Sequence, residues 1–244
     1  MLILIRKRHI VFGGLLCCFF AVLGMVFLSW QEGEALPTLA VGSSASELIL
    51  VIDPGHGGED SGAVSTNGSV MESHLNLEIA QRVEDLMNFL GQRTVMTRRE
   101  DVSIHSESAK NTRERKVSDL HNRVALVNSL ENAVLLSIHQ NSLPSSTVTH
   151  GAQVFWNSRE GAESWAQSVQ DALNQTINVG NEKHTKQIPS TIYLMKNITT
   201  PGILVECGFL SNSGETAMLQ QPAHQLKLAA AITAGCRSVE EGQL

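Results

Sequence analysis

Three side chains that can bind a metal ion or move a proton follow or lie within apolar runs of the sequence. His56 comes three residues after the run LILVID (Leu48–Asp53), and His139 ends the run AVLLSIH (Ala133–His139). Glu206 lies within a third run, GILVECGF. In open α/β sheets, ligands bind beyond the carboxyl ends of the strands. We therefore expect two imidazoles and one carboxylate to meet at one edge of a sheet.

Glu72 is a second candidate carboxylate. It lies three residues before Leu75, on the apolar side of a predicted helix, where a bare charge is costly to bury. Such a side chain needs a partner or a cation; the alternative is that an acid in a first turn only favours the helix dipole. Two histidines and one carboxylate around an open fourth position are typical of catalytic zinc sites. The residues thus predict one zinc ion, although they match no short motif such as HExxH.

The segment around His56 is rich in glycine. Gly55, Gly57, Gly58 and Gly62 carry no side chain, so the backbone can turn sharply there. We expect these glycines to keep side chains away from the metal and the substrate.

Strands and helices alternate along the part of the chain that carries these residues. Continuous apolar runs predict buried strands, and apolar residues three and four apart predict helices. The predicted strands are Leu48–Asp53, Arg93–Arg98, Ala133–His139, Gly151–Trp156 and Gly202–Phe209, and the predicted helices are Glu72–Leu90, Arg113–Leu130, Gly161–Ile177 and Ala223–Arg237. The alternation predicts a single α/β domain with a mainly parallel sheet and helices on both faces. The polar stretch 99–111 is predicted to be a long loop.

The N-terminal segment differs from the rest of the chain. Arg6, Lys7 and Arg8 precede the uncharged run Ile10–Trp30, which is long enough to cross a bilayer as a helix. The positive-inside rule then places the following chain outside the cytoplasm. A cleaved signal peptide is the alternative, and it would make the protein secreted instead of membrane-anchored. We predict a basic stub with an anchor or signal segment over 1–31, a flexible linker over 32–47, a catalytic domain over 48–238 and a C-terminal tail over 239–244.

Charge and cysteine content restrict the class of protein further. The net charge is −6, and three of the cations lie in the N-terminal stub, so the exported part is more acidic still. We therefore expect no nucleic acid partner. Only Cys207 and Cys236 lie in the exported part, and we predict two buried thiols, with a single disulfide as the alternative.

Four motifs occur in order over nearly the whole exported chain: VIDPGHGGEDSGA, ESHLNLEIA, LLSIHQNS and ILVECGFLSN. Together they resemble the zinc-dependent N-acetylmuramoyl-L-alanine amidases, often called type 3 amidases. The resemblance implies zinc held by His56, Glu72 and His139, with Glu206 as the catalytic carboxylate. Within the family, the single N-terminal anchor and the segments SIHQNS, GAQVFW and IYLMKN are most similar to the germination-specific spore-cortex amidases.

This resemblance implies a peptidoglycan hydrolase that cleaves the amide between N-acetylmuramic acid and L-alanine. In the spore cortex, that cleavage would be the first step of muramic-δ-lactam formation. The enzyme would act outside the cytoplasm, between the forespore membranes, with the N-terminal helix in a membrane and an accessory protein that activates the enzyme or loads its zinc site. Two alternatives stay open: a zinc peptidase that cuts stem peptides, and a catalytically inactive wall-binding protein of the same fold.

Overall fold

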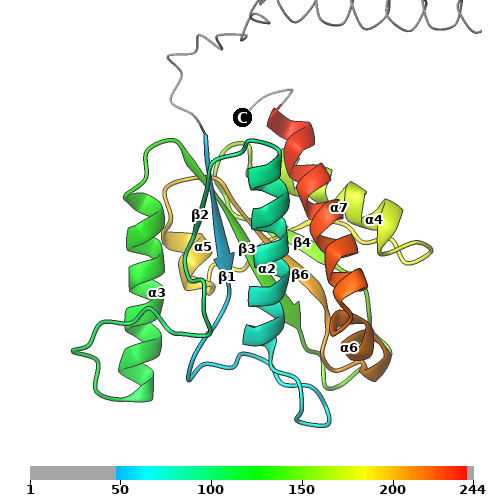
Figure 1. The fold of residues 1–244 in the computed structure, drawn as a ribbon, viewed down its shortest axis with the longest axis horizontal. Helices are drawn as coiled ribbons and strands as arrows, with labels where there is room; N and C mark the ends of the chain where they lie inside the picture. The colour runs from blue at the N-terminus through cyan, green and yellow to red at the C-terminus, as the bar shows by residue number, and fades with distance from the viewer. Residues whose placement is uncertain (1–47, 241–244) are drawn as a thin grey trace, which may run out of the picture. The chain divides into compact units, whose positions relative to one another are not determined.

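The computed structural model describes residues 48–240, which form a six-stranded sheet with helices against it (Figure 1). The strand order is β2-β1-β3-β6-β4-β5. The predicted anchor and linker, and the last four residues of the predicted tail, lie outside the described residues. Within the described part of the chain, no helix combines the length and the apolar character that a membrane span requires.

Four strands of the sheet run parallel, and two run in the opposite direction. β1 (Ile49–Pro54) pairs in parallel with β2 (Thr94–Met96) and β3 (Ala133–Asn141), and β3 pairs in parallel with β6 (Gly202–Phe209). β4 (Gln153–Trp156) pairs antiparallel with β6, and β5 (Lys186–Gln187) runs parallel to β4. The sheet is therefore mixed: the predicted mainly parallel arrangement holds for β1, β2, β3 and β6, whereas β4 and β5 run in the opposite direction. The reason is that the chain between β3 and β4 contains no crossover helix, which parallel strands usually need.

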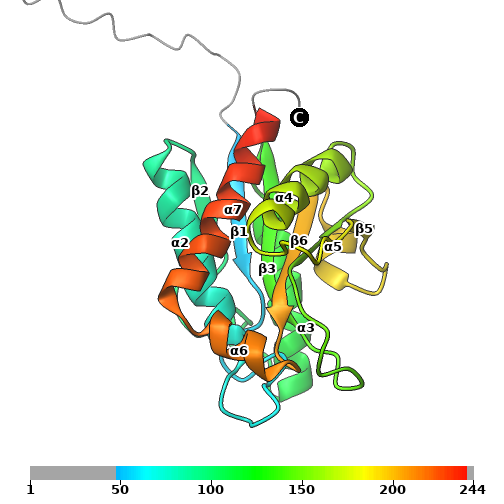
Figure 2. The same cartoon turned by 90° about the vertical axis from the view of Figure 1, so that its right-hand side faces the viewer.

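The helices cover both faces of the sheet, as predicted. α2 (Glu72–Phe89), α4 (Ala162–Thr176) and α7 (Pro222–Glu240) pack together on one face (Figure 2). α3 (Thr112–Asn128) and α5 (Tyr193–Asn197) lie on the other face, and α6 (Ser213–Leu219) follows β6. The sequence did not predict β5, α5 or α6, because elements of two, five and seven residues are too short to show a period.

Alternate residues of each strand face different hydrophobic cores. In β1, Leu50 and Ile52 belong to the larger core under α2, α4 and α7, whereas Ile49 and Val51 belong to the smaller core on the α3 side. Towards the carboxyl ends of the strands, the α3 side of the sheet changes from apolar to polar residues. These polar residues are Asp53 in β1, Ser137 and His139 in β3, and Glu206 in β6.

Helix α3 packs against the sheet partly through charged residues. Val127 is buried, but Val117 is 46% exposed, and Arg123 and Asp119 are buried. Nη1 of Arg123 lies 2.6 Å from Oδ1 of Asp53, and Nε lies 2.7 Å from Oδ2 of Asp119. A buried ion-pair network thus joins α3 to the end of β1, next to the polar edge of the sheet.

Candidate metal centre

His56 lies in the loop after β1, and its backbone has a φ of 62°, in the left-handed region that residues with a side chain rarely adopt. The carbonyl oxygen of His56 accepts a hydrogen bond of 2.7 Å from Nη2 of Arg123. Glycine is required next to it, because a Cβ atom on Gly55 would overlap the ring of His139. At Gly62, a Cβ would lie 2.7 Å from Cδ2 of His56. The expectation that these glycines keep side chains away from the site is confirmed at both positions.

Glu72 is the first residue of α2, and its side chain is buried against the sheet. Oε2 accepts a hydrogen bond of 2.7 Å from the backbone N–H of Ala63. Oε1 faces both histidines, at 3.3 Å from Nε2 of His56 and 2.8 Å from Nδ1 of His139. The buried position predicted for this carboxylate is therefore confirmed, and its partners are two imidazoles.

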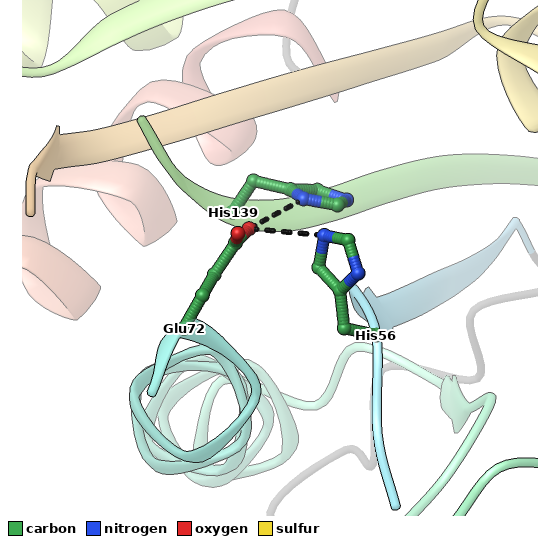
Figure 3. A group of neighbouring side chains, drawn as sticks. All are labelled: His56, Glu72 and His139. Carbon is green, nitrogen blue, oxygen red and sulfur yellow. Dashed lines mark hydrogen bonds and ion pairs between the residues drawn. The ribbon is translucent and has the colours of Figure 1, made fainter. Parts of the chain in front are cut away.

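His139 lies near the end of β3, at a point where the register with β6 shifts between His139 and Asn141. Figure 3 shows the His139 ring, the His56 ring and the Glu72 carboxylate pointing toward one another from three different elements. Each residue offers one ligand atom, and these atoms all lie within 4.8 Å of one another. Two nitrogen ligands and one oxygen ligand at this spacing can hold a divalent metal ion.

The charges around the two histidines favour a cation. Burial lowers the pKa of His56, but hydrogen bonds with Asp60 and Glu72 outweigh it and raise the pKa to about 9. Burial raises the pKa of Glu72, but hydrogen bonds from His139 and His56 hold it well below its usual range. The site therefore keeps a carboxylate ionised and stabilises positive charge beside it, which is the electrostatic environment that a metal ion needs.

Glu206 lies opposite His139 in the register of β6 and β3, and both line the same cleft. It is not part of the three-residue cluster that could hold a metal. Its Oε2 atom is buried and has no hydrogen-bond partner in the described part of the chain. Burial raises the pKa of Glu206 to about 7, although the nearby charge of His139 opposes this shift. Such a carboxyl can take up and release a proton near neutral pH.

The cleft that contains these four side chains has a volume of about 400 Å³. Another part of its wall comes from Ile188 and residues 191–195, which include part of α5, and from Leu120 and Lys116 of α3. The sequence did not place this wall at the site, because α5 is too short to show a period and the segment IYLMKN (192–197) was noted only for its similarity to the germination-specific amidases. It also missed Asp60, which lies 2.9 Å from His56 through Oδ2 and Nδ1; its place four residues after His56 in a loop was the available signal.

In the part of the chain that the structure describes, the other histidines and the two cysteines take no part in the cluster. His74 pairs with Asp101, and the ring of His121 stacks on Tyr193 with centroids 5.1 Å apart. Cys207 and Cys236 form no disulfide with each other, and both thiols are buried, as predicted.

Comparison with known proteins gives a consistent result. The profile of the family described as N-acetylmuramoyl-L-alanine amidase matches residues 50–238. The chain is 40% identical over 191 residues to the germination-specific N-acetylmuramoyl-L-alanine amidase of Bacillus subtilis, covering 78% of each chain. Its fold is similar to the CwlD amidase of Clostridioides difficile, solved in complex with the GerS lipoprotein, with a TM-score of 0.75 and 30% identity over 79% of this chain and 98% of that one.

A second solved structure agrees with the first. The catalytic domain of CwlV, an N-acetylmuramoyl-L-alanine amidase from Bacillus (Paenibacillus) polymyxa var. colistinus, has a TM-score of 0.67 and 26% identity, over 80% of this chain and 98% of that one. The family profile covers nearly the whole fold described above, including all four candidate site residues in the cleft. The chain therefore belongs to the N-acetylmuramoyl-L-alanine amidase family, and it is a peptidoglycan amidase of that type.

Proposed function

We propose that the protein is a zinc enzyme that hydrolyses the amide between the lactyl group of N-acetylmuramic acid and L-alanine. His56, Glu72 and His139 would hold one zinc ion, and Glu206 would be the catalytic carboxylate. The observation that carries this proposal is the convergence of two imidazoles and one carboxylate within 4.8 Å at the polar edge of the sheet. Family membership supplies the substrate class.

The residues present fit zinc. Two neutral imidazoles and one carboxylate that leave a further position open are the ligand set of catalytic zinc sites, whereas structural sites are usually closed by cysteines. The two described cysteines are buried away from the cluster. When bound, zinc supplies Lewis acidity that polarises an amide carbonyl and acidifies water.

Glu206 is suited to move protons in this reaction. Its carboxylate would accept a proton from the attacking water and later give it to the nitrogen of the leaving L-alanine. The buried Oε2 atom without a partner supports this role, because a carboxylate that serves structure alone is normally hydrogen-bonded. A pKa of about 7 allows the side chain to exchange a proton in either direction at neutral pH.

Digestion of purified peptidoglycan with the purified full chain, with and without added zinc, tests the proposal. An amidase releases intact stem peptides with L-alanine at the amino terminus and leaves glycan strands without peptide. A peptidase leaves shortened stems on muramic acid, and an inactive wall-binding protein leaves the polymer unchanged. Mass spectrometry of the products separates these three outcomes, and either of the last two would refute the proposal.

We also propose that the enzyme acts on spore cortex, as the first step of muramic-δ-lactam formation, with help from an accessory protein. The support is the 40% identity to a germination-specific amidase and the fold similarity to an amidase solved with a lipoprotein partner. Spores from a strain that lacks the gene should contain cortex without muramic-δ-lactam. Normal lactam content in those spores would refute the cortex role.

The proposed place of action is outside the cytoplasm, where the substrate lies. Residues 1–31 would be the membrane anchor or signal segment, residues 32–47 a linker, residues 48–238 the catalytic domain and residues 239–244 a tail. The family profile, which begins at residue 50, supports the boundary between linker and catalytic domain. Fractionation of cells that express the full chain, followed by protease treatment of intact cells, tests this arrangement.

A further inference from the structure

The backbone of His56 is fixed by a buried cation. Its left-handed conformation, with φ 62°, is unfavourable for a residue with a side chain and must be held by its surroundings. Nη2 of Arg123 donates a hydrogen bond of 2.7 Å to the carbonyl oxygen of His56, and Arg123 itself forms ion pairs with Asp53 and Asp119. The backbone from which the His56 side chain extends therefore has a defined position.

The two ring nitrogens of His56 have different neighbours. Nδ1 lies 2.9 Å from Oδ2 of Asp60, and Nε2 lies 3.3 Å from Oε1 of Glu72, inside the cluster. An ionised carboxylate can only accept a hydrogen bond, so Nδ1 must carry a proton to donate to Asp60. In a neutral imidazole this leaves the lone pair on Nε2, which faces the cluster, as the metal ligand.

Asp60 is held in turn by three groups outside the cluster. Nζ of Lys116 on α3 lies 3.1 Å from Oδ2, and the backbone N–H of Gly62 lies 3.4 Å from Oδ1. The backbones of Gly57 and Asp60 also exchange two hydrogen bonds, of 2.9 and 3.3 Å. The carboxylate of Asp60 therefore cannot move away from His56 without breaking several contacts.

We propose that Asp60 is a positioning residue of the metal site: it fixes the tautomer and orientation of His56, and Lys116 fixes Asp60. This inference rests on the proposed zinc site. Partners that orient a metal-bound histidine typically contribute about 10- to 100-fold in metal affinity. Removal of the Asp60 carboxylate should therefore weaken zinc binding by about that factor without removing any of the three ligands.

The chain offers a matched control for a purely structural role of Asp60. The neighbouring Glu59 forms an ion pair with Arg115, so two adjacent acids of the loop pair with two adjacent cations of α3. Both acids are partly exposed, at 53% for the side chain of Glu59 and 30% for that of Asp60. Of these two acids, only Asp60 contacts the His56 ring in the described structure. Loss of either ion pair weakens the link between the loop and α3, but only loss of the Asp60 carboxylate also removes a contact with the His56 imidazole.

The test is a zinc titration, in competition with a chelator, of the purified full chain and of Asp60→Ala and Glu59→Ala. We expect Asp60→Ala to bind zinc about 10- to 100-fold more weakly and Glu59→Ala to bind it like the parent. Equal losses in both variants, or no loss in Asp60→Ala, would overturn the inference while leaving the zinc site in place. A parent chain that binds no zinc would instead refute the proposed metal site, and this inference with it.

A second measurement uses the parent protein alone and so does not depend on whether a variant folds. Nitrogen-15 NMR of the imidazoles in the zinc-loaded parent reports which ring nitrogen of His56 carries the proton. We expect the proton on Nδ1 and the metal on Nε2. A proton on Nε2 of His56 would overturn the inference, whatever the variants do.

Discussion

The ion pair between Arg123 and Asp53 should be one of the strongest single contributions to the stability of the domain. Both side chains are almost fully buried, at 2% and 1% exposure, and the two atoms nearest each other lie 2.6 Å apart. Removing one partner of a buried pair leaves an unpaired charge and typically costs about 3–5 kcal/mol. We therefore expect Arg123→Met to lower the free energy of unfolding by about that amount.

The pH dependence gives a second measure of the same contact. Burial raises the pKa of Asp53, but the charge of Arg123 and hydrogen bonds from Ser137 and Thr97 together have the larger effect. They lower the pKa from 3.8 to about 2. This shift corresponds to about 2 kcal/mol at 1.36 kcal/mol per pKa unit. Because the folded pKa is the lower one, the contribution is complete above about pH 4 and is lost as the pH falls towards 2.

Urea unfolding followed by tryptophan fluorescence, to which the buried Trp165 contributes, measures both effects. Arg115→Met is the matched control, since Arg115 lies on the same helix but pairs with the partly exposed Glu59, and exposed pairs contribute only about 0–1 kcal/mol. The parent should lose stability between pH 4 and 2, whereas Arg123→Met should lose less over that range. Equal unfolding free energies for Arg123→Met and Arg115→Met would refute the reasoning.

Three further predictions concern the site. His139→Ala removes one of three ligands and should purify without stoichiometric zinc; metal analysis that finds one zinc per chain would exclude His139 as a ligand. Glu206→Gln should keep zinc but lose about 10²- to 10⁴-fold in the rate of peptide release from peptidoglycan, and loss of zinc in this variant would instead make Glu206 a ligand. Gly55→Ala should lower zinc affinity because its Cβ would overlap the His139 ring, whereas Gly214→Ala, whose Cβ meets nothing nearer than 3.4 Å, should not; equal zinc affinities by chelator competition would contradict this.

Simple rules of sheet geometry located the site from the sequence. His56 follows one continuous apolar run and His139 ends another, and such runs become buried strands whose carboxyl ends meet at one edge. Glu72 could be recognised because it interrupts an apolar stripe, and a charge in that place needs a partner. Both inferences depend on the order of apolar and polar residues within one strand or helix, which can be read from the sequence alone.

What the sequence did not reveal depends on contacts between distant segments. The run GAQVFW looks the same in a parallel and an antiparallel strand, so the reversed direction of β4 could not be read from it. Arg123 occupies the inner side of α3 because Asp53 lies opposite, and nothing near Arg123 in the sequence announces that partner. The hydrogen bond from Arg123 to the carbonyl oxygen of His56 could not be predicted for the same reason.

The three candidate ligands come from a loop, the first residue of a helix and the end of a strand, at positions 56, 72 and 139. An ion bound by all three side chains would cross-link the chain across two segments of very different length, 56–72 and 72–139. The three ligands are far apart in an unfolded chain, which therefore contains no preformed metal site. Binding would have to wait until β1 and β3 lie side by side. Hydrolytic activity would then require the folded domain, and a newly synthesised chain would be inactive until it had folded and bound the metal ion.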